Sequence, residues 1–168
     1  MHFGPIRLPF LSGPLPSGAA LLAIRVVMGP MLAYHGYKKY DGGVEKFVAT
    51  VDRLGFPLPE LLARATIVIE LAGGICLTLG LLTRLWAALS TLQFLLIVAK
   101  VKWAIGVFGQ PGRSGFELDL LYAVTAAALL LAGPGLLAID HFLGLEADPS
   151  ADAEPLEARL RTGGRSAG

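Results

Sequence analysis

Two charged residues lie where the surrounding sequence is almost entirely apolar. Arg25 is part of the stretch from Gly18 to Tyr34, and Glu70 is part of the stretch from Leu61 to Leu82. A charge at the centre of a bilayer costs roughly 2.5 to 3.5 kcal/mol on insertion scales, so it is normally paired or faces a wet cavity. A carboxylate there can exchange protons, and a guanidinium can stabilise negative charge on a bound substrate.

The positions of the two charges along their stretches predict that they meet. Arg25 lies nine residues before the end of the first stretch, and Glu70 lies nine residues after the start of the second. One connector joins these two ends, so at about 1.5 Å per residue both charges lie roughly 13 to 14 Å below the same membrane face. We therefore predict an Arg25–Glu70 pair, which either ties two helices together or contacts a substrate.

Further ionisable side chains are predicted at the same membrane face. His35 and Lys39 follow the first apolar stretch, and Glu117 opens the last one. Because consecutive spans alternate in direction, these ends lie on one side of the bilayer. We expect them to form, with Arg25 and Glu70, a polar funnel from that face to mid-membrane. In it Glu70 and Glu117 would be catalytic, and the substrate-binding residues would be Arg25, His35 and Lys39.

Most of these positions also have a purely structural interpretation. Lysines at helix ends commonly reach the lipid headgroups, and we prefer this reading for Lys38 and Lys102. Acidic residues favour a helix N-terminus because it carries partial positive charge. Glu117 and Asp119 lie about 200° apart on a helix, so at most one of them faces the interior well. Gln93, midway along the third apolar stretch, either lines the cavity or bonds a neighbouring helix, and we favour the second.

Four apolar stretches must position these residues: 18–34, 61–82, 85–101 and 116–137. Each can cross a hydrocarbon core of about 30 Å, which takes about 17 to 25 helical residues. The chain has 168 residues, of which 54% are hydrophobic and 16% charged, more apolar surface than a soluble domain of this size can bury. The sequence predicts an all-α integral membrane four-helix bundle over residues 1–145, followed by a polar tail, 146–168, predicted to be disordered.

The connector between the first two stretches predicts a short amphipathic helix that either lies on the membrane surface or caps the bundle. Charged residues occupy one side of it, and Gly55 followed by Pro57 ends it. Its apolar residues recur at helical spacing: Val44, Phe47, Val48, Val51 and Leu54. The connector between the second and third stretches is only "LTRL", which makes those helices antiparallel neighbours.

Composition excludes several classes of partner and cofactor. A net charge of +1 does not favour nucleic acid, and the single cysteine, Cys76, excludes an internal disulfide or a CxxC pair. The sequence shows no metal-ligand cluster, no haem-binding pair of histidines and no flavin fingerprint. We expect no covalently bound cofactor, so any redox chemistry would use a quinone, a partner subunit or both.

The ordered set of motifs resembles the DoxX family of small four-helix integral membrane proteins. The matching pieces are "LLAIRVVMGPMLAYHGYKKY", "FVATVDRLGFPLP", "VIELAGGICLTLGLLTR", "GFELDLLYAVTAAALLLAGPG" and the following Asp140. The resemblance selects Lys39 over Lys38 and points to Glu70 and Glu117. It implies a multi-pass protein of the bacterial inner membrane, associated with thiosulfate:quinone oxidoreduction or with complexes that handle sulfur and oxidative stress. A redox or sulfurtransferase subunit would be its partner.

Three functions are compatible with these residues. The first is a quinone-linked redox subunit, the second a non-catalytic assembly subunit whose ion pair holds the bundle together, and the third a small-molecule carrier. The positive-inside rule places the face with Lys38, Lys39, Lys46, Arg53 and Arg113 in the cytoplasm. The sequence leaves open whether the chain is itself catalytic, what its electron donor is and whether it forms homo-oligomers.

Overall fold

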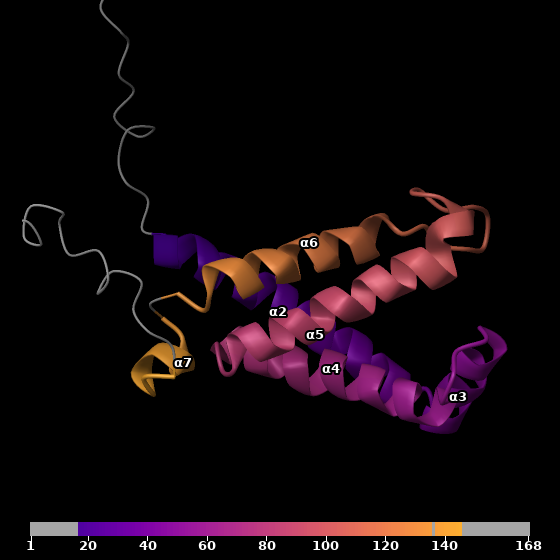
Figure 1. Ribbon diagram of the computed structural model, residues 1–168, viewed down its shortest axis with the longest axis horizontal. Helices are drawn as coiled ribbons and strands as arrows, with labels where there is room; N and C mark the ends of the chain where they lie inside the picture. Colours follow the sequence, from indigo (N-terminus) through magenta and orange to yellow (C-terminus); the bar gives the residue numbers. More distant parts are fainter. Residues whose placement is uncertain (1–16, 136, 146–168) are drawn as a thin grey trace, which may run out of the picture.

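The computed structural model describes residues 17–135 and 137–145, and all regular structure in these residues is helical (Figure 1). The predicted polar tail, 146–168, lies outside the described residues. The elements are α2 (Ser17–Asp41), α3 (Val44–Arg53), α4 (Pro59–Leu79), α5 (Thr83–Leu96), the π-helical η1 (Ile97–Lys102), the 3-10 turn η2 (Trp103–Ile105), α6 (Glu117–Ala132) and α7 (Ile139–Phe142).

Three helices in the described part of the chain are long and apolar enough to cross a membrane: Gly18–Asp41, Pro59–Leu79 and Thr83–Ile105. The predicted fourth stretch, 116–137, is shorter as a helix than expected. α6 has 16 residues, because Gly133 adopts a φ of 80° and Pro134 follows it. At 1.5 Å per residue α6 is about 24 Å long, less than a hydrocarbon core of about 30 Å.

The first helix also differs from its predicted length. α2 continues past Tyr34 to Asp41 and ends where Gly43 takes a φ of 102°. His35 and Lys39, predicted at the end of the first helix, therefore lie within its last two turns. Because α2 ends at Asp41, every membrane depth that was counted from Tyr34 changes.

α2 and α4 pack closely because glycines line their contact. A Cβ atom added to Gly36 would collide with the backbone nitrogen of Leu71, and one added to Gly74 would collide with the backbone of Ala33. Small residues allow the close approach of helices on which packing in membranes depends. Since residue numbers rise along α2 as they fall along α4, the two helices are antiparallel and their register is fixed.

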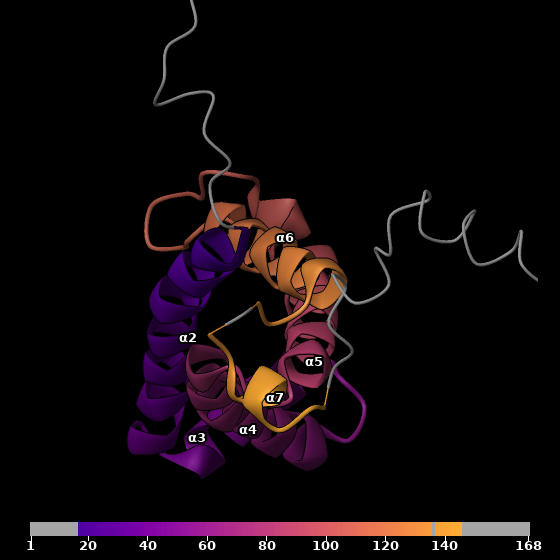
Figure 2. The ribbon, with the colours of Figure 1, turned by 90° about the vertical axis from the view of Figure 1, so that its left-hand side faces the viewer.

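Viewed along its long axis, the molecule is a ring of four helices in the order α2, α4, α5, α6 (Figure 2). The pairs α2–α4 and α5–α6 share extensive contacts, whereas α2 and α6 touch sparsely. In Figure 1 the α5–α6 pair diverges from α4 away from the α4–α5 turn. The larger hydrophobic residues of the core come from α2, α4, α5 and α6 and include Leu32, Leu77, Phe94 and Leu129.

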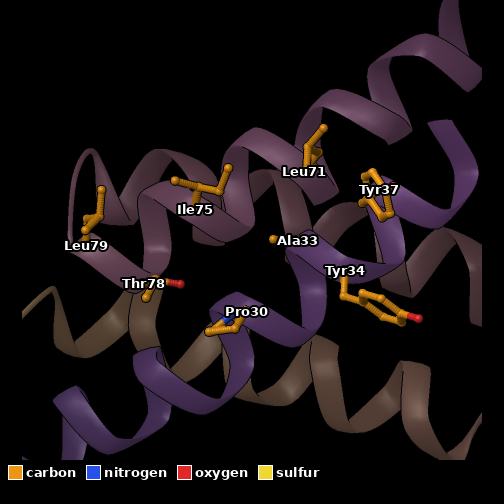
Figure 3. A pocket seen from close by; sticks show the side chains of 8 residues that line it. All are labelled: Pro30, Ala33, Tyr34, Tyr37, Leu71, Ile75, Thr78 and Leu79. Atoms are coloured by element: carbon orange, nitrogen blue, oxygen red, sulfur yellow. The ribbon is translucent and has the colours of Figure 1, made fainter. Parts of the chain in front are cut away.

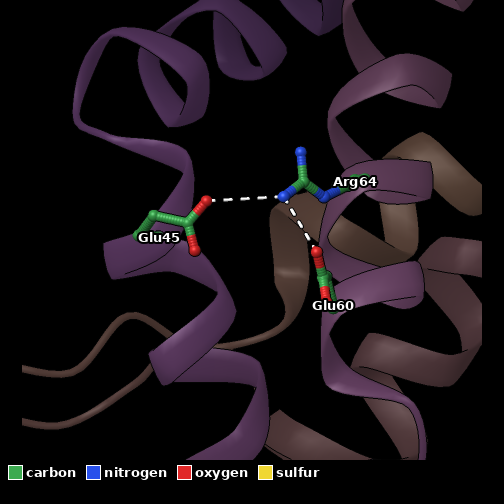
Figure 4. Close-up of polar contacts among 3 residues, drawn as sticks. All are labelled: Glu45, Glu60 and Arg64. Atoms are coloured by element: carbon green, nitrogen blue, oxygen red, sulfur yellow. Dashed lines mark hydrogen bonds and ion pairs between the residues drawn. The ribbon is translucent and has the colours of Figure 1, made fainter.

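The connector helix α3 packs against the first half of α4. Val51 is buried, while Lys46 and Asp52 are exposed. Arg64 of α4 holds α3 through Glu45, at 3.4 Å, and also bonds Glu60 of its own helix, at 3.0 Å (Figure 4). A helix is thus present where the sequence predicts one, and its position on the membrane surface stays a prediction.

Candidate functional site

Glu70 is the centre of a buried polar group contributed by three helices. Its side chain is 2% exposed, and the Lys39 ammonium of α2 forms an ion pair with Oε2. Gln93 of α5 donates from Nε2 to the other oxygen, Oε1, at 2.7 Å. Lys39 retains 27% exposure, and its ammonium lies 5.7 Å from the centre of the Phe47 ring on α3. Both carboxylate oxygens therefore have a partner, one charged and one neutral.

The close packing of α2 against α4 places Lys39 beside Glu70. Gly36 lies opposite Leu71, so the residue one turn later on α2 comes next to the residue just before Leu71 on α4. Gln93 confirms its expected role, since it bonds a side chain of a neighbouring helix. The register of α2 against α4 therefore brings Lys39 and Glu70 together.

Aromatic residues from α6 and α5 extend the site on the side of His35. The Tyr122 ring meets the His35 ring edge to face, with centroids 6.0 Å apart, and stacks on Phe94 at 4.9 Å. His35 lies one turn before Lys39 on α2 and is close enough to Glu70 to interact with it electrostatically. The described residues offer no hydrogen-bond partner to three buried polar atoms here: Tyr122 Oη, Ser90 Oγ and Gln93 Oε1.

A second lysine–carboxylate pair lies at the start of α6. Lys102 Nζ in η1 is 2.6 Å from Asp119 Oδ2, and the two side chains are 22% and 12% exposed. Glu117, the predicted catalytic residue, is exposed and has no side-chain contact with Glu70. Of the two acidic residues of α6, the interior position belongs to Asp119. The headgroup role preferred for Lys102 is wrong, because its ammonium bonds Asp119.

The predicted pair between Arg25 and Glu70 is wrong. Arg25 donates from Nη2 to the carbonyl oxygen of Leu137, at 3.1 Å, and Glu70 is bound by Lys39. On α2, Arg25 precedes Lys39 by 14 residues, which is about 21 Å. The depth comparison failed because α2 ends at Asp41 rather than at Tyr34.

Arg25 belongs instead to a structural cluster at the α4–α5 turn. Arg25 is 0% exposed and Asp140 is 1% exposed, and the two interact electrostatically. Asp140 accepts from the backbone nitrogens of Leu82, at 2.6 Å, and Thr83, at 2.8 Å, which caps the N-terminus of α5. These contacts tie the segment after α6 to the turn. They give Arg25 a structural role and place it away from the Glu70 group.

A shallow groove of about 490 Å³ runs along the outer side of α2 and α4 (Figure 3). On α4 its lining residues lie on a different face from Glu70, which is turned into the ring. No charged side chain lines it, so its surface suits lipid chains more than chemistry. The lining residues are Pro30, Ala33, Tyr34, Tyr37, Leu71, Ile75, Thr78 and Leu79.

Comparisons with known proteins agree with the motifs. The DoxX family model matches residues 20–103, half of the chain. The chain is also 31% identical over 124 residues to "Putative oxidoreductase CatD" of Bacillus subtilis (strain 168), a match that covers 73% of this chain and 85% of the relative. The chain belongs to the DoxX family. No solved structure matches it.

Membership of the DoxX family, with three candidate spans, makes this a multi-pass membrane protein. The family match includes Lys39, Glu70, Gln93 and Lys102, and ends before α6, which supplies Tyr122 and Asp119. Within the described residues, no group of three His, Cys, Asp or Glu side chains could hold a metal ion. This DoxX-family protein has a buried carboxylate with one cationic donor and one neutral donor, Lys39 and Gln93. Beside it lie two hydroxyl groups and one amide oxygen without partners among the described residues.

Proposed function

We propose that this DoxX-family protein is the membrane subunit of a quinone-linked oxidoreductase and binds the quinone headgroup beside Glu70. The observation that carries the proposal is the buried Lys39–Glu70–Gln93 group, to which three helices contribute. The name of the Bacillus subtilis relative, "Putative oxidoreductase CatD", supports the same class of chemistry.

The polar atoms without partners fit a quinone headgroup. A quinone presents two carbonyl oxygens, which accept hydrogen bonds, on a flat apolar ring. The hydroxyl groups of Tyr122 and Ser90 are donors with no partner among the described residues, and the aromatic rings of Tyr122 and Phe94 provide a stacking surface. These residues would orient the headgroup, and the sparse contact between α2 and α6 offers a route from the lipid.

Reduction of a quinone to a quinol takes two electrons and two protons. The electrons would come from an outside donor, either a reduced sulfur compound or a dehydrogenase or sulfurtransferase subunit. In this proposal Lys39 and His35 donate hydrogen bonds to a carbonyl oxygen and stabilise negative charge that develops on it. Glu70 would take up a proton from the water side and deliver it to that oxygen, and the second proton would reach the other carbonyl oxygen, also from water.

The proposed function includes a four-span topology. α6 would be the fourth span, with a local thinning of the bilayer compensating for its length of about 24 Å. α3 would lie at the membrane surface over Lys39. By the positive-inside rule this end would face the cytoplasm, where a soluble partner subunit could reach it.

The test is binding of a short-tailed quinone analogue to the purified protein in nanodiscs, measured by isothermal titration calorimetry. Glu70→Gln should weaken binding at least about tenfold, since Lys39 loses the carboxylate that holds it beside the headgroup. Glu60→Gln is the matched control, an exposed carboxylate on the same helix. Equal affinities of the two variants for the quinone analogue would show that Glu70 is not part of the binding site. They would favour the assembly subunit, in which the buried ion pairs only hold helices together.

A further inference from the structure

Tyr122 lies between the two lysine–carboxylate pairs. On α6 it follows Asp119 by one helical turn, so both side chains lie on the same face. On its other side its ring meets His35 of α2 and stacks on Phe94, the neighbour of Gln93, which bonds Glu70. Both carboxylates, Glu70 and Asp119, are close enough to act electrostatically on the Tyr122 hydroxyl.

The Tyr122 hydroxyl is held in place and chemically free. Tyr122 is 6% exposed, and its ring is fixed by rings on two neighbouring helices. Its oxygen has no hydrogen-bond partner among the described residues, although a buried hydroxyl normally has one. A phenol is both a donor and an acceptor, so it can pass a proton on without a net change of its own charge.

We propose that Tyr122 relays protons from Asp119, near the membrane face, to Glu70. In each transfer the proton of the Asp119 carboxyl moves to the Tyr122 oxygen, while the hydroxyl proton of Tyr122 moves to the Glu70 carboxylate. One proton is displaced, and Tyr122 returns to its neutral form. Tyr122 Oη has no direct partner in the described residues, so in this relay a water molecule would have to bridge each gap.

The direction proposed for the relay, from Asp119 to Glu70, follows from the different exposure of the two carboxylates. Asp119 is partly open to water and is faced by Lys102 from η1, whereas Glu70 is enclosed by Lys39 and His35 of α2 and by Gln93 of α5. A π-helical segment such as η1 is frequent at functional sites, and here it carries Lys102. Lys39 is 27% exposed and provides the competing route, directly from the surface to Glu70.

The relay rests on the proposed function only for the last step, in which the proton on Glu70 passes to the quinone. Protonation of Glu70 itself can be tested without a quinone. Protons are released from a caged acid in nanodisc samples, and time-resolved infrared spectroscopy follows the carboxyl band that Glu70→Gln removes. Tyr122→Phe keeps the ring and deletes the hydroxyl, and it should slow protonation of Glu70 at least about tenfold. Asp119→Asn should slow it to a similar extent.

Thr125→Val is the matched control, since it removes another hydroxyl of α6, one that bonds only the carbonyl oxygen of Leu121. Thermal melting verifies that each variant is folded, and Tyr122→Phe decides alone if Asp119→Asn does not fold. A protonation rate in Tyr122→Phe within about twofold of that in Thr125→Val overturns the relay. Slowing in Lys39→Met without slowing in Tyr122→Phe overturns it as well. If the wild-type protein does not bind the quinone analogue, the proposed function is refuted, but the relay is not.

Discussion

Removing the positive partner of Glu70 should destabilise the protein measurably. Lys39→Met keeps the length and apolar stem of the side chain but leaves a carboxylate that is 2% exposed without its cation. Breaking a fully buried ion pair costs about 3 to 5 kcal/mol. Here Lys39 is 27% exposed and the hydrogen bond from Gln93 remains, so we expect a smaller loss, about 1 to 3 kcal/mol.

The measurement is thermal unfolding of the purified protein in detergent. For a chain of this size, 1 kcal/mol shifts Tm by about 2 to 4 °C, so Lys39→Met should lower Tm by roughly 2 to 12 °C. Lys38→Met is the matched control, because Lys38 is the neighbouring residue and its pair with Asp41 is exposed.

The double variant Lys39→Met, Glu70→Met distinguishes a pair from two independent residues. Replacing both partners by apolar groups removes the uncompensated charge, so the double variant should recover much of the loss. The cycle also needs the single variant Glu70→Met. If Lys39→Met melts within 1 °C of Lys38→Met, the ion pair inferred from the structure does not exist in the membrane protein. The same follows if the stability losses of Lys39→Met and Glu70→Met add up to the loss of the double variant.

Three further outcomes are expected in the same thermal unfolding assay. Asp140→Ala should cost about 2 to 4 kcal/mol, because α5 loses its cap and buried Arg25 loses its counter-charge, whereas exposed Asp52→Ala should change stability by less than about 0.5 kcal/mol; an equal effect of both would contradict the capping role. Gly36→Ala should destabilise by about 1 to 3 kcal/mol, since its methyl group meets the backbone of α4, and an unchanged Tm would exclude the close α2–α4 contact. Arg64→Met should cost no more than about 1 kcal/mol, because both of its ion pairs are exposed, and a larger loss would show that α3 is held mainly by Arg64.

The sequence predicted the helical class and the residue at the centre of the site. Glu70 was identified because a charge in an apolar helix needs a partner, and Gln93 because a mid-helix amide bonds a neighbour. Each has a partner, since Glu70 pairs with Lys39 and Gln93 bonds Glu70, whereas the catalytic role of Glu70 stays a prediction. The DoxX resemblance selected Lys39 over Lys38, and the structure pairs Lys39 with Glu70.

The partners of the buried charges could not be predicted, because they depend on helix ends and register. Nothing in the apolar pattern after Tyr34 shows that α2 continues to Asp41, and this continuation carries Lys39 to Glu70. Arg25 interacts with Asp140, far along the chain, through the fold of the segment that follows α6.

The choice between Glu117 and Asp119 required the rotation of α6 about its axis. Spacing predicted that at most one of them faces inward. Packing decides which, as Phe116 stacks on Trp103 at 5.8 Å and Lys102 reaches Asp119. Tyr122 was missed because an isolated tyrosine in an apolar helix carries no signal of its own, although it follows Asp119 at the spacing of one helical turn.

The most direct test of quinone binding at Glu70 is the carbonyl stretching frequency of a bound quinone analogue labelled with carbon-13 at both carbonyl groups. Infrared difference spectra of the wild-type protein should show one carbonyl band shifted further to lower frequency than the other, because the Lys39 cation and His35 donate to that oxygen. In Lys39→Met this band should move back toward its solvent position, and in Lys38→Met it should stay. A bound analogue whose carbonyl bands are unshifted, or shifted equally in Lys39→Met, would contradict the assignment of this site to a quinone.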